Sequence, residues 1–508
     1  MATSTHPSLV LLNAKIESAS SPVDIVIEDG AVTQVVPSGT SALTDPLSSI
    51  DLAGRSVIPG LWDQHVHFTQ WTNMRTRLDL SRATSAAETL EIVGEAIAAM
   101  KAAHPEDANT PLKLMGSSFR DGLWPDKPTI AALDAVVGEA IVILVSGDLH
   151  CAWLSSAAIA SFGAAPPADE LFREFEWFAL KPSQQNAGDG PGMAEYAETA
   201  AAAAARGIVG LTDFEAEDNI AVWTERVQAG VRSLRIKACV WPHRMDGAIE
   251  RGLKTGDVVD GTDGLVTLGP LKVVVDGSLN TRTAFCHDPY PGMTADDENA
   301  YGILSVPGSE LVSLLKRAKD NGIGAAIHAI GDEANGIVLD AFEEVGMRGA
   351  IEHAQLVDEK DFARFASLGI QASVQPEHAM DDRDVADRHW AGRTARAFAF
   401  GSLLEAGAEL TLGSDAPVAP LDPWHAISAA VSRSRDGREP WHPEQSISAK
   451  AAISASTGGN GSDVTVGMIA DLVILDLDPF TASAEELRDM PVSGTLRAGE
   501  FTWRAPAL

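Results

Sequence analysis

The sequence predicts an α/β protein whose largest part is a (β/α)8 barrel. Apolar runs typical of strands alternate with Ala-rich helical patterns, which is the order of parallel βα units. There are eight such runs, and eight parallel strands close a barrel. Most of them end in polar or ionisable residues, as expected where the C-terminal strand ends form an active face. The runs cover residues 60–67, 207–214, 235–241, 271–277, 324–330, 349–355, 369–376 and 409–415.

The two ends of the chain predict a small β domain. Short alternating strands with turn signals fill residues 8–57, and the same pattern returns near the C-terminus, for example in "GMIADLVILDLDP". Neither piece has enough strands to be stable alone. We therefore expect residues 1–57 and 456–508 to build one sheet domain around a barrel formed by residues 58–75 and 206–455.

A long insertion, residues 76–205, separates the first barrel strand from the second. It has strand candidates of its own at residues 112–119 and 141–150, and a helix-favouring Ala-rich stretch at residues 193–207. We expect this insertion to form a lid or substrate-covering subdomain.

The composition is that of a folded globular protein. The chain has 508 residues, of which 45% are hydrophobic and 21% are charged. The 71 acidic residues outnumber the 38 basic ones, and the net charge of −33 opposes contact with nucleic acid or anionic membranes. We expect a small-molecule substrate as the partner, and neither nucleic acid nor a membrane.

The N-terminal sequence and the cysteines predict a cytoplasmic protein without disulfides. The first residues contain no basic region followed by an apolar core, and no stretch reaches about 18 apolar residues. Cys151, Cys239 and Cys286 are far apart and form no CxxC pair. Neither a disulfide framework nor a thiolate metal site is therefore expected.

Histidine and aspartate residues at strand ends predict a metal site. His65 and His67 lie two apart on the first strand, so both rings point to the same face. Later strand ends supply His328, His353 and Asp415. Each of these three alone is more typical of a satisfied polar side chain than of a ligand. Their ordered recurrence at strand ends favours a shared metal centre.

A lysine stands at the head of the fourth barrel run, "LKVVVDGSLN". An unpaired ammonium group in a buried strand is strongly destabilising. Lys272 must therefore pair with Asp276 or another barrel carboxylate, lose its proton or reach solvent.

Seven motifs occur in order along nearly the whole chain: "PGLWDQHVH", "DGSLNTRTA", "IHAIGDEAN", "IEHAQ", "SVQPEH", "LGSDAPV" and "GMIADLVILDLDP". Together they resemble the amidohydrolase superfamily of metal-dependent hydrolases. More narrowly, they are similar to its amidohydrolase family 3 branch, which includes N-substituted formamide deformylase-like enzymes. The resemblance implies a (β/α)8 TIM-like barrel with metal at the C-terminal strand ends, and a β-sandwich built from both chain termini.

The resemblance also implies a set of metal ligands. One or two divalent ions would be held by His65, His67, Lys272, His328, His353 and Asp415. Lys272 falls on the fourth strand, where several branches of the superfamily carry a metal-bridging lysine. A neutral lysine amine can add carbon dioxide to form a carbamate, which turns a buried cation into an anionic ligand. We expect zinc, with manganese or iron as alternatives, because imidazole and carboxylate ligands suit all three.

The implied reaction is hydrolysis of a carbon–nitrogen bond other than a peptide bond, in an amide, a formamide or another N-acyl compound. The metal would supply a hydroxide at neutral pH, and Asp415 would act as general base and then as general acid. His353 or the metal would polarise the substrate carbonyl. The alternatives are an esterase, or an isomerase or hydratase, on the same scaffold, and a non-catalytic binding barrel.

Four further residues are candidates for substrate contact. His150 lies in "GDLHCAW", which resembles an Asp-Gly-His segment of the family with Leu149 in place of glycine; core packing or a loop hydrogen bond is the alternative. Arg282 would clamp a carboxylate or carbonyl, or hold its loop by a salt bridge. Gln375 and His378 follow the seventh strand, where they would line the pocket or stabilise a loop. The resemblance also makes a homo-oligomer an expectation.

Overall fold

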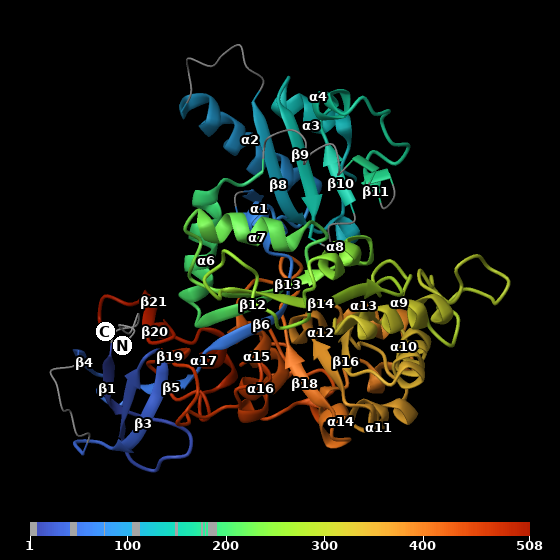
Figure 1. Cartoon of the computed structure of the whole chain (residues 1–508). Coiled ribbons are helices and arrows are strands. Elements are labelled where there is room, and N and C mark those ends of the chain that lie inside the picture. The colour runs from blue at the N-terminus through green and yellow to red at the C-terminus, as the bar shows by residue number, and fades with distance from the viewer. Residues whose placement is uncertain are drawn as a thin grey trace. The chain divides into compact units, whose positions relative to one another are not determined.

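The chain folds into two compact units in the computed structural model, which Figure 1 shows as a ribbon. One unit joins Met1–Phe68 to Tyr196–Leu508, and the other is Thr69–Glu195. The residues that the structure describes are 8–40, 48–75, 77–103, 112–147, 151–173, 176–177, 179–180 and 190–508.

Eight parallel strands form the central sheet of the larger unit. They are joined in the order β18-β17-β16-β15-β14-β13-β12-β6, so each barrel strand pairs with the barrel strand that comes before or after it along the chain. All residues of β12 are buried, as expected of a parallel strand covered on both faces. The prediction of eight parallel strands is confirmed. Their bounds are Leu61–Val66 (β6), Ile208–Asp213 (β12), Arg235–Val240 (β13), Val266–Val274 (β14), Ala325–Ala329 (β15), Gly349–His353 (β16), Ile370–Val374 (β17) and Glu409–Leu412 (β18).

Hydrogen bonds beyond the end of β18 bring the eighth strand back to the first. Val66 and Ala416 form a parallel bridge. The Asp415 N–H donates to the His65 carbonyl at 2.7 Å, and the His67 N–H donates to the Ala416 carbonyl at 2.8 Å. The sheet is therefore nearly closed into a barrel, and the closure fixes the end of β6 beside Asp415.

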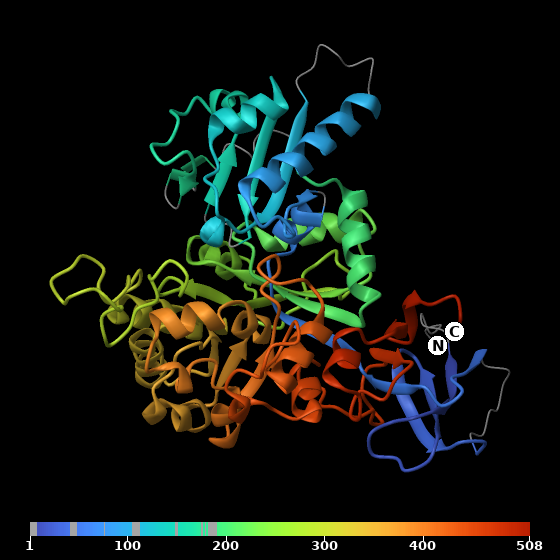
Figure 2. The same ribbon diagram turned by 180° about the vertical axis from the view of Figure 1, so that it is seen from behind.

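Helices follow the barrel strands and lie around them (Figure 2). Helix α10 illustrates how the sequence sets their ends: Asp332 and Glu333 lie in its first turn, where carboxylates stabilise the helix dipole, and Gly346 ends it with a left-handed φ of 62°. The helices of this part are Asn219–Gln228 (α7), Met245–Glu250 (α8), Gly308–Asp320 (α9), Asp332–Val345 (α10), Glu359–Leu368 (α11), Pro376–Asp381 (α12), Arg383–His389 (α13), Phe400–Glu405 (α14), Pro423–Ser432 (α15), Ala449–Ala455 (α16) and Ala484–Arg488 (α17).

Both ends of the chain form small sheets in the same unit. One sheet has the order β3-β2-β1-β4, and the other, β21-β20-β19-β5, joins a strand from the N-terminal part to three from the C-terminal part. Buried residues of both sheets, among them Leu11, Ile25, Leu472 and Leu496, belong to one hydrophobic cluster. The strands are Leu9–Ala14 (β1), Val23–Glu28 (β2), Ala31–Pro37 (β3), Ser48–Asp51 (β4), Ser56–Pro59 (β5), Leu472–Leu475 (β19), Val492–Arg497 (β20) and Glu500–Arg504 (β21).

The smaller unit has a five-stranded sheet of its own, in the order β11-β10-β9-β8-β7. Two hydrophobic clusters stabilise it; Trp153 is buried in one and Trp177 in the other. The predicted strands at residues 112–119 and 141–150 correspond to β8 and β9. The elements are Leu78–Asp79 (β7), Ala86–Ala103 (α2), Lys113–Phe119 (β8), Ile130–Val137 (α3), Ile141–Ser146 (β9), Cys151–Leu154 (β10), Ser156–Ser161 (α4) and Phe172–Arg173 (β11), and the helices Phe68–Arg75 (α1) and Met193–Ala204 (α6) lie where the chain passes between the units.

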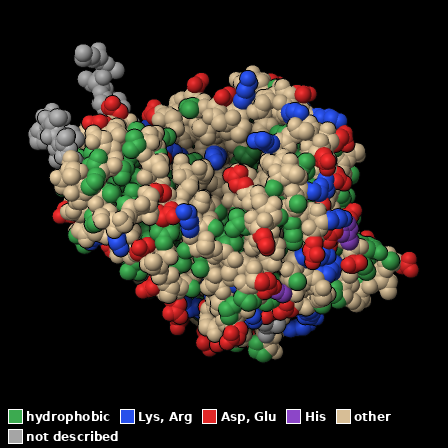
Figure 3. Space-filling model, turned by 90° about the horizontal axis from the view of Figure 1, so that it is seen from below, with side chains coloured by type: hydrophobic (Ala, Val, Ile, Leu, Met, Phe, Trp, Pro, Cys, Tyr) green, Lys and Arg blue, Asp and Glu red, His purple; other side chains and the backbone are tan. Residues whose placement is uncertain are grey.

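Charged side chains of both signs are mixed on one face of the molecule (Figure 3). On the face that Figure 3 shows, Lys and Arg side chains are interspersed with Asp and Glu rather than gathered into one basic patch. Among the described residues, no helix combines the length and the apolar character needed to cross a membrane.

Candidate metal centre

The C-terminal ends of the barrel strands bring a carboxylate and several imidazoles together. His65 lies on β6 and His67 directly follows it, so the alternation of the strand keeps both rings on one side. Asp415 follows β18 with a left-handed φ of 55°. Its Oδ1 atom lies 3.6 Å from His65 Nε2 and 3.5 Å from His67 Nε2. We call these three residues the first ligand group.

A second ligand group, His353, His378 and Asp415, shares the same carboxylate. His353 ends β16, and His378 lies on α12 just after β17. His378 Nε2 lies 3.2 Å from Asp415 Oδ2, and the rings of His378 and His353 stack with centroids 6.1 Å apart and planes 12° apart. The sequence predicts a substrate contact at His378, whereas the structure puts it among possible metal ligands.

The geometry of both groups fits a metal ion. Two nitrogen or oxygen ligands at usual zinc distances lie about 3.4 Å apart when the coordination is tetrahedral, close to the separations in the first group. The ligand atoms within each group all lie within 4.8 Å of one another. In addition, the Nδ1 atoms of His67, His353 and His378 are buried and have no hydrogen-bond partner in the described part of the chain. A buried nitrogen without a protein partner commonly binds water or an ion, but in the first group the Nε2 atoms face Asp415 Oδ1, so the fit of an ion there rests on the distances.

The charges of the centre also suit a cation. Burial alone would raise the pKa of Asp415, but the neighbouring His65 and the hydrogen bonds from His378 and His67 hold it well below its usual range. Burial drives the pKa of His65 and of His353 well below that of a free histidine. At neutral pH the centre therefore contains an ionised carboxylate at Asp415 and neutral imidazoles at His65 and His353, the forms that bind metal, whereas hydrogen bonds to Asp415 raise the pKa of His67 and of His378.

Lys272 lies at the edge of the first ligand group. It is buried on β14, and its Nζ atom is 3.3 Å from His65 Nε2 and 4.4 Å from the ring centroid of Phe214. Burial lowers its pKa, against the opposing effect of Glu352. Asp276 is not its partner, because that carboxylate accepts backbone N–H groups after β14 and β15. Of the alternatives for Lys272, the ion pair with Asp276 is thus excluded.

His328 lies beside the second ligand group without belonging to it. Its ring centroid is 4.4 Å from that of His353. Its Nε2 atom is 3.3 Å from the Gly277 carbonyl oxygen and 3.6 Å from Asp276 Oδ1. Burial lowers the pKa of His328 to about 3, so its ring is neutral near pH 7. Its role as a metal ligand stays a prediction.

Glu352 is a residue of the centre that the sequence did not point to. Its Oε2 atom lies 2.6 Å from His65 Nδ1, and both side chains are buried. The register pairs Glu352 with His328 on the neighbouring strand, so both point to the same face. His353, the next residue, has a left-handed φ of 76° that breaks the alternation and allows adjacent residues to serve one site. Strand periodicity alone would therefore place either His353 or Glu352 in the centre, but not both.

The remaining predicted substrate contacts have different surroundings. Gln375 is buried at the end of β17; its Nε2 donates to the Ser373 carbonyl at 3.3 Å, and its Oε1 has no partner among the described residues. Arg282 is exposed on the loop after β14, with a left-handed φ of 56°. His150 lies outside the described residues.

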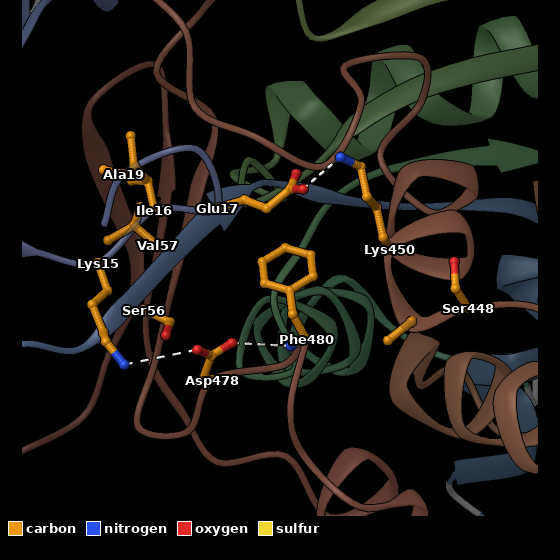
Figure 4. Close-up of a pocket in the computed structure, with 11 residues that line it drawn as sticks. Lys15, Ile16, Glu17, Ala19, Ser56, Val57, Ser448, Lys450, Asp478 and Phe480 are labelled. Atoms are coloured by element: carbon orange, nitrogen blue, oxygen red, sulfur yellow. Dashed lines mark hydrogen bonds and ion pairs between the residues drawn. The ribbon is translucent and has the colours of Figure 1, made fainter. Parts of the chain in front are cut away.

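A surface pocket of about 350 Å³ lies elsewhere in the larger unit and contains none of the predicted site residues. Figure 4 shows Phe480 in it, between two ion pairs, Lys15 with Asp478 and Lys450 with Glu17. Each lysine is already paired with a carboxylate, so the pocket offers no unpaired charge to select a ligand.

Comparison with known proteins identifies the family of the chain. The chain matches the amidohydrolase family over residues 49–502, which is most of its length. The chain belongs to the amidohydrolase family. The family resemblance predicted from the motifs is thereby confirmed.

The relatives of this amidohydrolase are distant but span nearly its whole length. It is 25% identical over 536 residues to the protein LONG AFTER FAR-RED 3 of Arabidopsis thaliana, with 94% of this chain and 89% of the relative covered. It is 25% identical over 547 residues to N-substituted formamide deformylase of Arthrobacter pascens, with 96% of each chain covered. A crystal structure of an uncharacterised metal-dependent hydrolase from Pyrococcus furiosus superposes with a TM-score of 0.74 at 25% identity, covering 93% of this chain and 100% of that one. The family places the amidohydrolase among metal-dependent hydrolases of carbon–nitrogen bonds, as predicted.

Proposed function

We propose that this amidohydrolase cleaves a non-peptide carbon–nitrogen bond in an amide, a formamide or another N-acyl compound, with Asp415 as general base and then general acid. The observation that carries the proposal is the position of Asp415: its carboxylate oxygens lie within 3.6 Å of ring nitrogens of His65, His67 and His378. One ionised carboxylate surrounded by imidazoles at the active end of a barrel supports both metal binding and proton transfer at one point.

The two ligand groups would hold the metal. His65 and His67 with Asp415 Oδ1 would bind one divalent ion, and His353 and His378 with Asp415 Oδ2 would bind a second. When bound, such an ion lowers the pKa of a water molecule toward about 7 and polarises a carbonyl oxygen. Zinc is the ion we expect, with manganese or iron as alternatives. Lys272, as a carbamate, would add an anionic oxygen beside His65, from which its nitrogen lies 3.3 Å away.

The protein groups then move the proton. Asp415 is ionised at neutral pH and accepts the proton of the attacking water, and it delivers the same proton to the leaving nitrogen. In the metal-free protein, His378 Nε2 is in hydrogen-bond contact with Asp415 Oδ2 and holds the carboxylate in one orientation. His353, whose ring stacks on that of His378, or the metal would polarise the substrate carbonyl. Glu352 fixes the orientation of His65 through the short contact to Nδ1.

The nature of the substrate is inferred from a relative. The Arthrobacter pascens protein is named an N-substituted formamide deformylase and matches this chain over nearly all of both sequences. We therefore place N-substituted formamides first among the N-acyl compounds to be tested. Proteins with one fold can act on different substrates, so the compounds to be tested differ in the acyl group.

A substrate panel tests the proposed function. It contains N-substituted formamides, the matching acetamides and the matching esters, assayed with protein that has been reconstituted with zinc or manganese, and with Asp415→Asn as the control. Hydrolysis of an amide or formamide by the wild type, and its loss in the variant, is the expected result. Hydrolysis of the esters alone would favour an esterase, and no turnover by a metal-loaded protein would contradict the proposal.

We further propose that the two terminal sheets together form a β-sandwich. The proposal rests on the hydrophobic cluster to which both contribute, including Ile25 from one sheet and Leu472 from the other. Amide hydrogen exchange tests it: Leu472→Asn should weaken protection in both sheets at once, whereas loss confined to the sheet of Leu472 would contradict a shared core.

A further inference from the structure

We propose that Glu377 is a positioning residue for His378, and that two arginines, Arg435 and Arg488, hold Glu377 in place. The inference rests on the proposed function, because His378 matters only as the partner of Asp415 in the metal centre. It makes α17, a helix of the C-terminal segment, part of the apparatus that orients the active site.

The helix that presents His378 is too short to hold its own position. Helix α12 has six residues, from Pro376 to Asp381, and no side chain caps its N-terminus. Isolated helices of this length are unstable, so contacts with other elements must fix it. Among the described residues, the polar contact of the His378 ring is at Nε2, to Asp415, since its Nδ1 has no partner there. Its orientation therefore depends on where α12 is held.

Glu377 supplies a hold on another face of the same helix, α12. Adjacent helical residues project about 100° apart, so Glu377 points away from the direction that His378 takes toward Asp415. The Glu377 side chain is only 4% exposed. A buried carboxylate needs charged partners, and removal of those partners would leave an uncompensated charge.

Both oxygens of Glu377 are occupied by arginine. Arg488 donates through Nη1 to Oε1 at 2.8 Å and through Nη2 to Oε2 at 3.1 Å. Arg435 donates through Nη1 to Oε2 at 3.0 Å, and its Nη2 donates to Asp381 Oδ1, at the end of α12, at 2.7 Å. Because each arginine makes two hydrogen bonds, these contacts fix the orientation of the carboxylates as well as their distance. They hold α12 at two residues, Glu377 and Asp381.

The arginines come from elements that are themselves anchored. Arg435 follows α15, the helix after the strand that leads to Asp415. Arg488 ends α17, which is joined to α15 by the hydrogen bond from Ser428 Oγ to the Ala484 carbonyl at 2.7 Å. The bridge from Arg488 through Glu377 to His378 thus connects the C-terminal segment to the Asp415 carboxylate.

Kinetics and metal binding test the inference with Glu377→Gln, which keeps the size of the side chain but weakens its grip on both arginines. We expect kcat for the hydrolysed amide to fall about 10- to 100-fold, as is common when a residue that orients a metal ligand is changed, with a much smaller change in KM. His378→Ala should lower kcat at least as much. Because Glu377 acts through His378, the double variant should be no worse than His378→Ala alone.

A matched pair on the next helix provides the control. Asp384 on α13 accepts two hydrogen bonds from Arg438, at 3.0 and 2.6 Å, in the same bidentate manner but at the exposed surface. Asp384→Asn should leave kcat and KM unchanged. Two outcomes would show a merely structural role for Glu377 and overturn the inference. One is a double variant whose loss of kcat equals the product of the losses in Glu377→Gln and His378→Ala. The other is a Glu377→Gln variant with a lower melting temperature but unchanged kcat.

A second readout separates this inference from the proposed function. Co²⁺ is titrated into metal-free wild type and variants, and its d–d absorption reports the ligand geometry without any substrate. Glu377→Gln should shift the spectrum or the affinity in the same direction as His378→Ala, while Asp384→Asn should match the wild type. If no panel substrate is turned over, the proposed function fails, yet the spectra still decide the role of Glu377: a spectrum and affinity equal to those of the wild type would overturn it.

Discussion

The two ligand groups share Asp415 but are built in different ways. In the first, His65 and His67 come from one strand, and the backbone bonds that close the barrel hold them beside Asp415. In the second, His353 depends on a left-handed residue at the end of β16, and His378 depends on a six-residue helix. The first group is placed by the period of one strand and by backbone bonds between strands, and the second by an unusual backbone angle and by a short helix. The first group should therefore tolerate changes elsewhere better than the second does.

The largest effect is expected at the residue that both groups share. Asp415→Asn removes an anionic ligand and the general base together, and we expect kcat/KM to fall by about 10³-fold or more. Steady-state kinetics with metal-reconstituted protein measure it. Activity within about tenfold of wild type would show that the two groups do not share a functional carboxylate.

Next in size is the loss of one imidazole from each group. His67→Ala and His378→Ala each remove one ligand, which should weaken metal binding by roughly 100-fold at the affected group only. Competition with a chromophoric chelator measures the affinities. His442→Ala, at a histidine outside both groups that contacts Glu444 Oε1 through Nδ1 at 2.8 Å, is the control. Equal damage by all three variants would contradict the distinction between the groups.

A smaller effect is expected from the carboxylate behind the first group. Glu352→Gln weakens the 2.6 Å contact to His65 Nδ1, and we expect metal affinity to fall about 10- to 100-fold. Glu444→Gln alters the same kind of contact on His442 and should leave metal affinity unchanged. Isothermal titration with Zn²⁺ compares the two. Equal Zn²⁺ affinities of the two variants would show that Glu352 does not support the metal centre.

The smallest effect is a pH dependence that both groups should show. Burial lowers the pKa of His67 and of His378, but the hydrogen bond to Asp415 outweighs it, so the pKa of each is raised above 6.5 in the metal-free protein. Protonated imidazole does not bind metal, so affinity should be level above these pKa values and should fall below them, by up to about tenfold per pH unit for each proton released. Proton release during Zn²⁺ titration in two buffers measures it. If Zn²⁺ binding released no protons near neutral pH, the assignment of His67 and His378 as metal ligands would be contradicted.

Sequence reasoning reached the first group more completely than the second for physical reasons. The eight strands follow from apolar runs with polar ends, and His65 and His67 follow from the period of a strand. That His353 serves the same site as its neighbour Glu352 depends on the left-handed φ of His353, which no periodicity indicates. Likewise, Arg488 lies 111 residues from Glu377 along the chain, so only the folded structure brings them together.

The predicted substrate contacts show the same limit. Gln375 could be predicted at the end of a strand because strand ends are regular. The orientation of Arg282 depends on a loop, where neither period nor register constrains the side chain, and the structure leaves it exposed.

The most direct test of the metal centre is anomalous diffraction from crystals of the protein as purified and after zinc reconstitution. The account predicts a peak about 2.0–2.2 Å from His65 Nε2, His67 Nε2 and Asp415 Oδ1, with a second peak near His353 and His378 and density for a carbamate on Lys272 if the centre is binuclear. A crystal that binds zinc elsewhere, with these side chains hydrogen-bonded only to one another, would contradict the central claim.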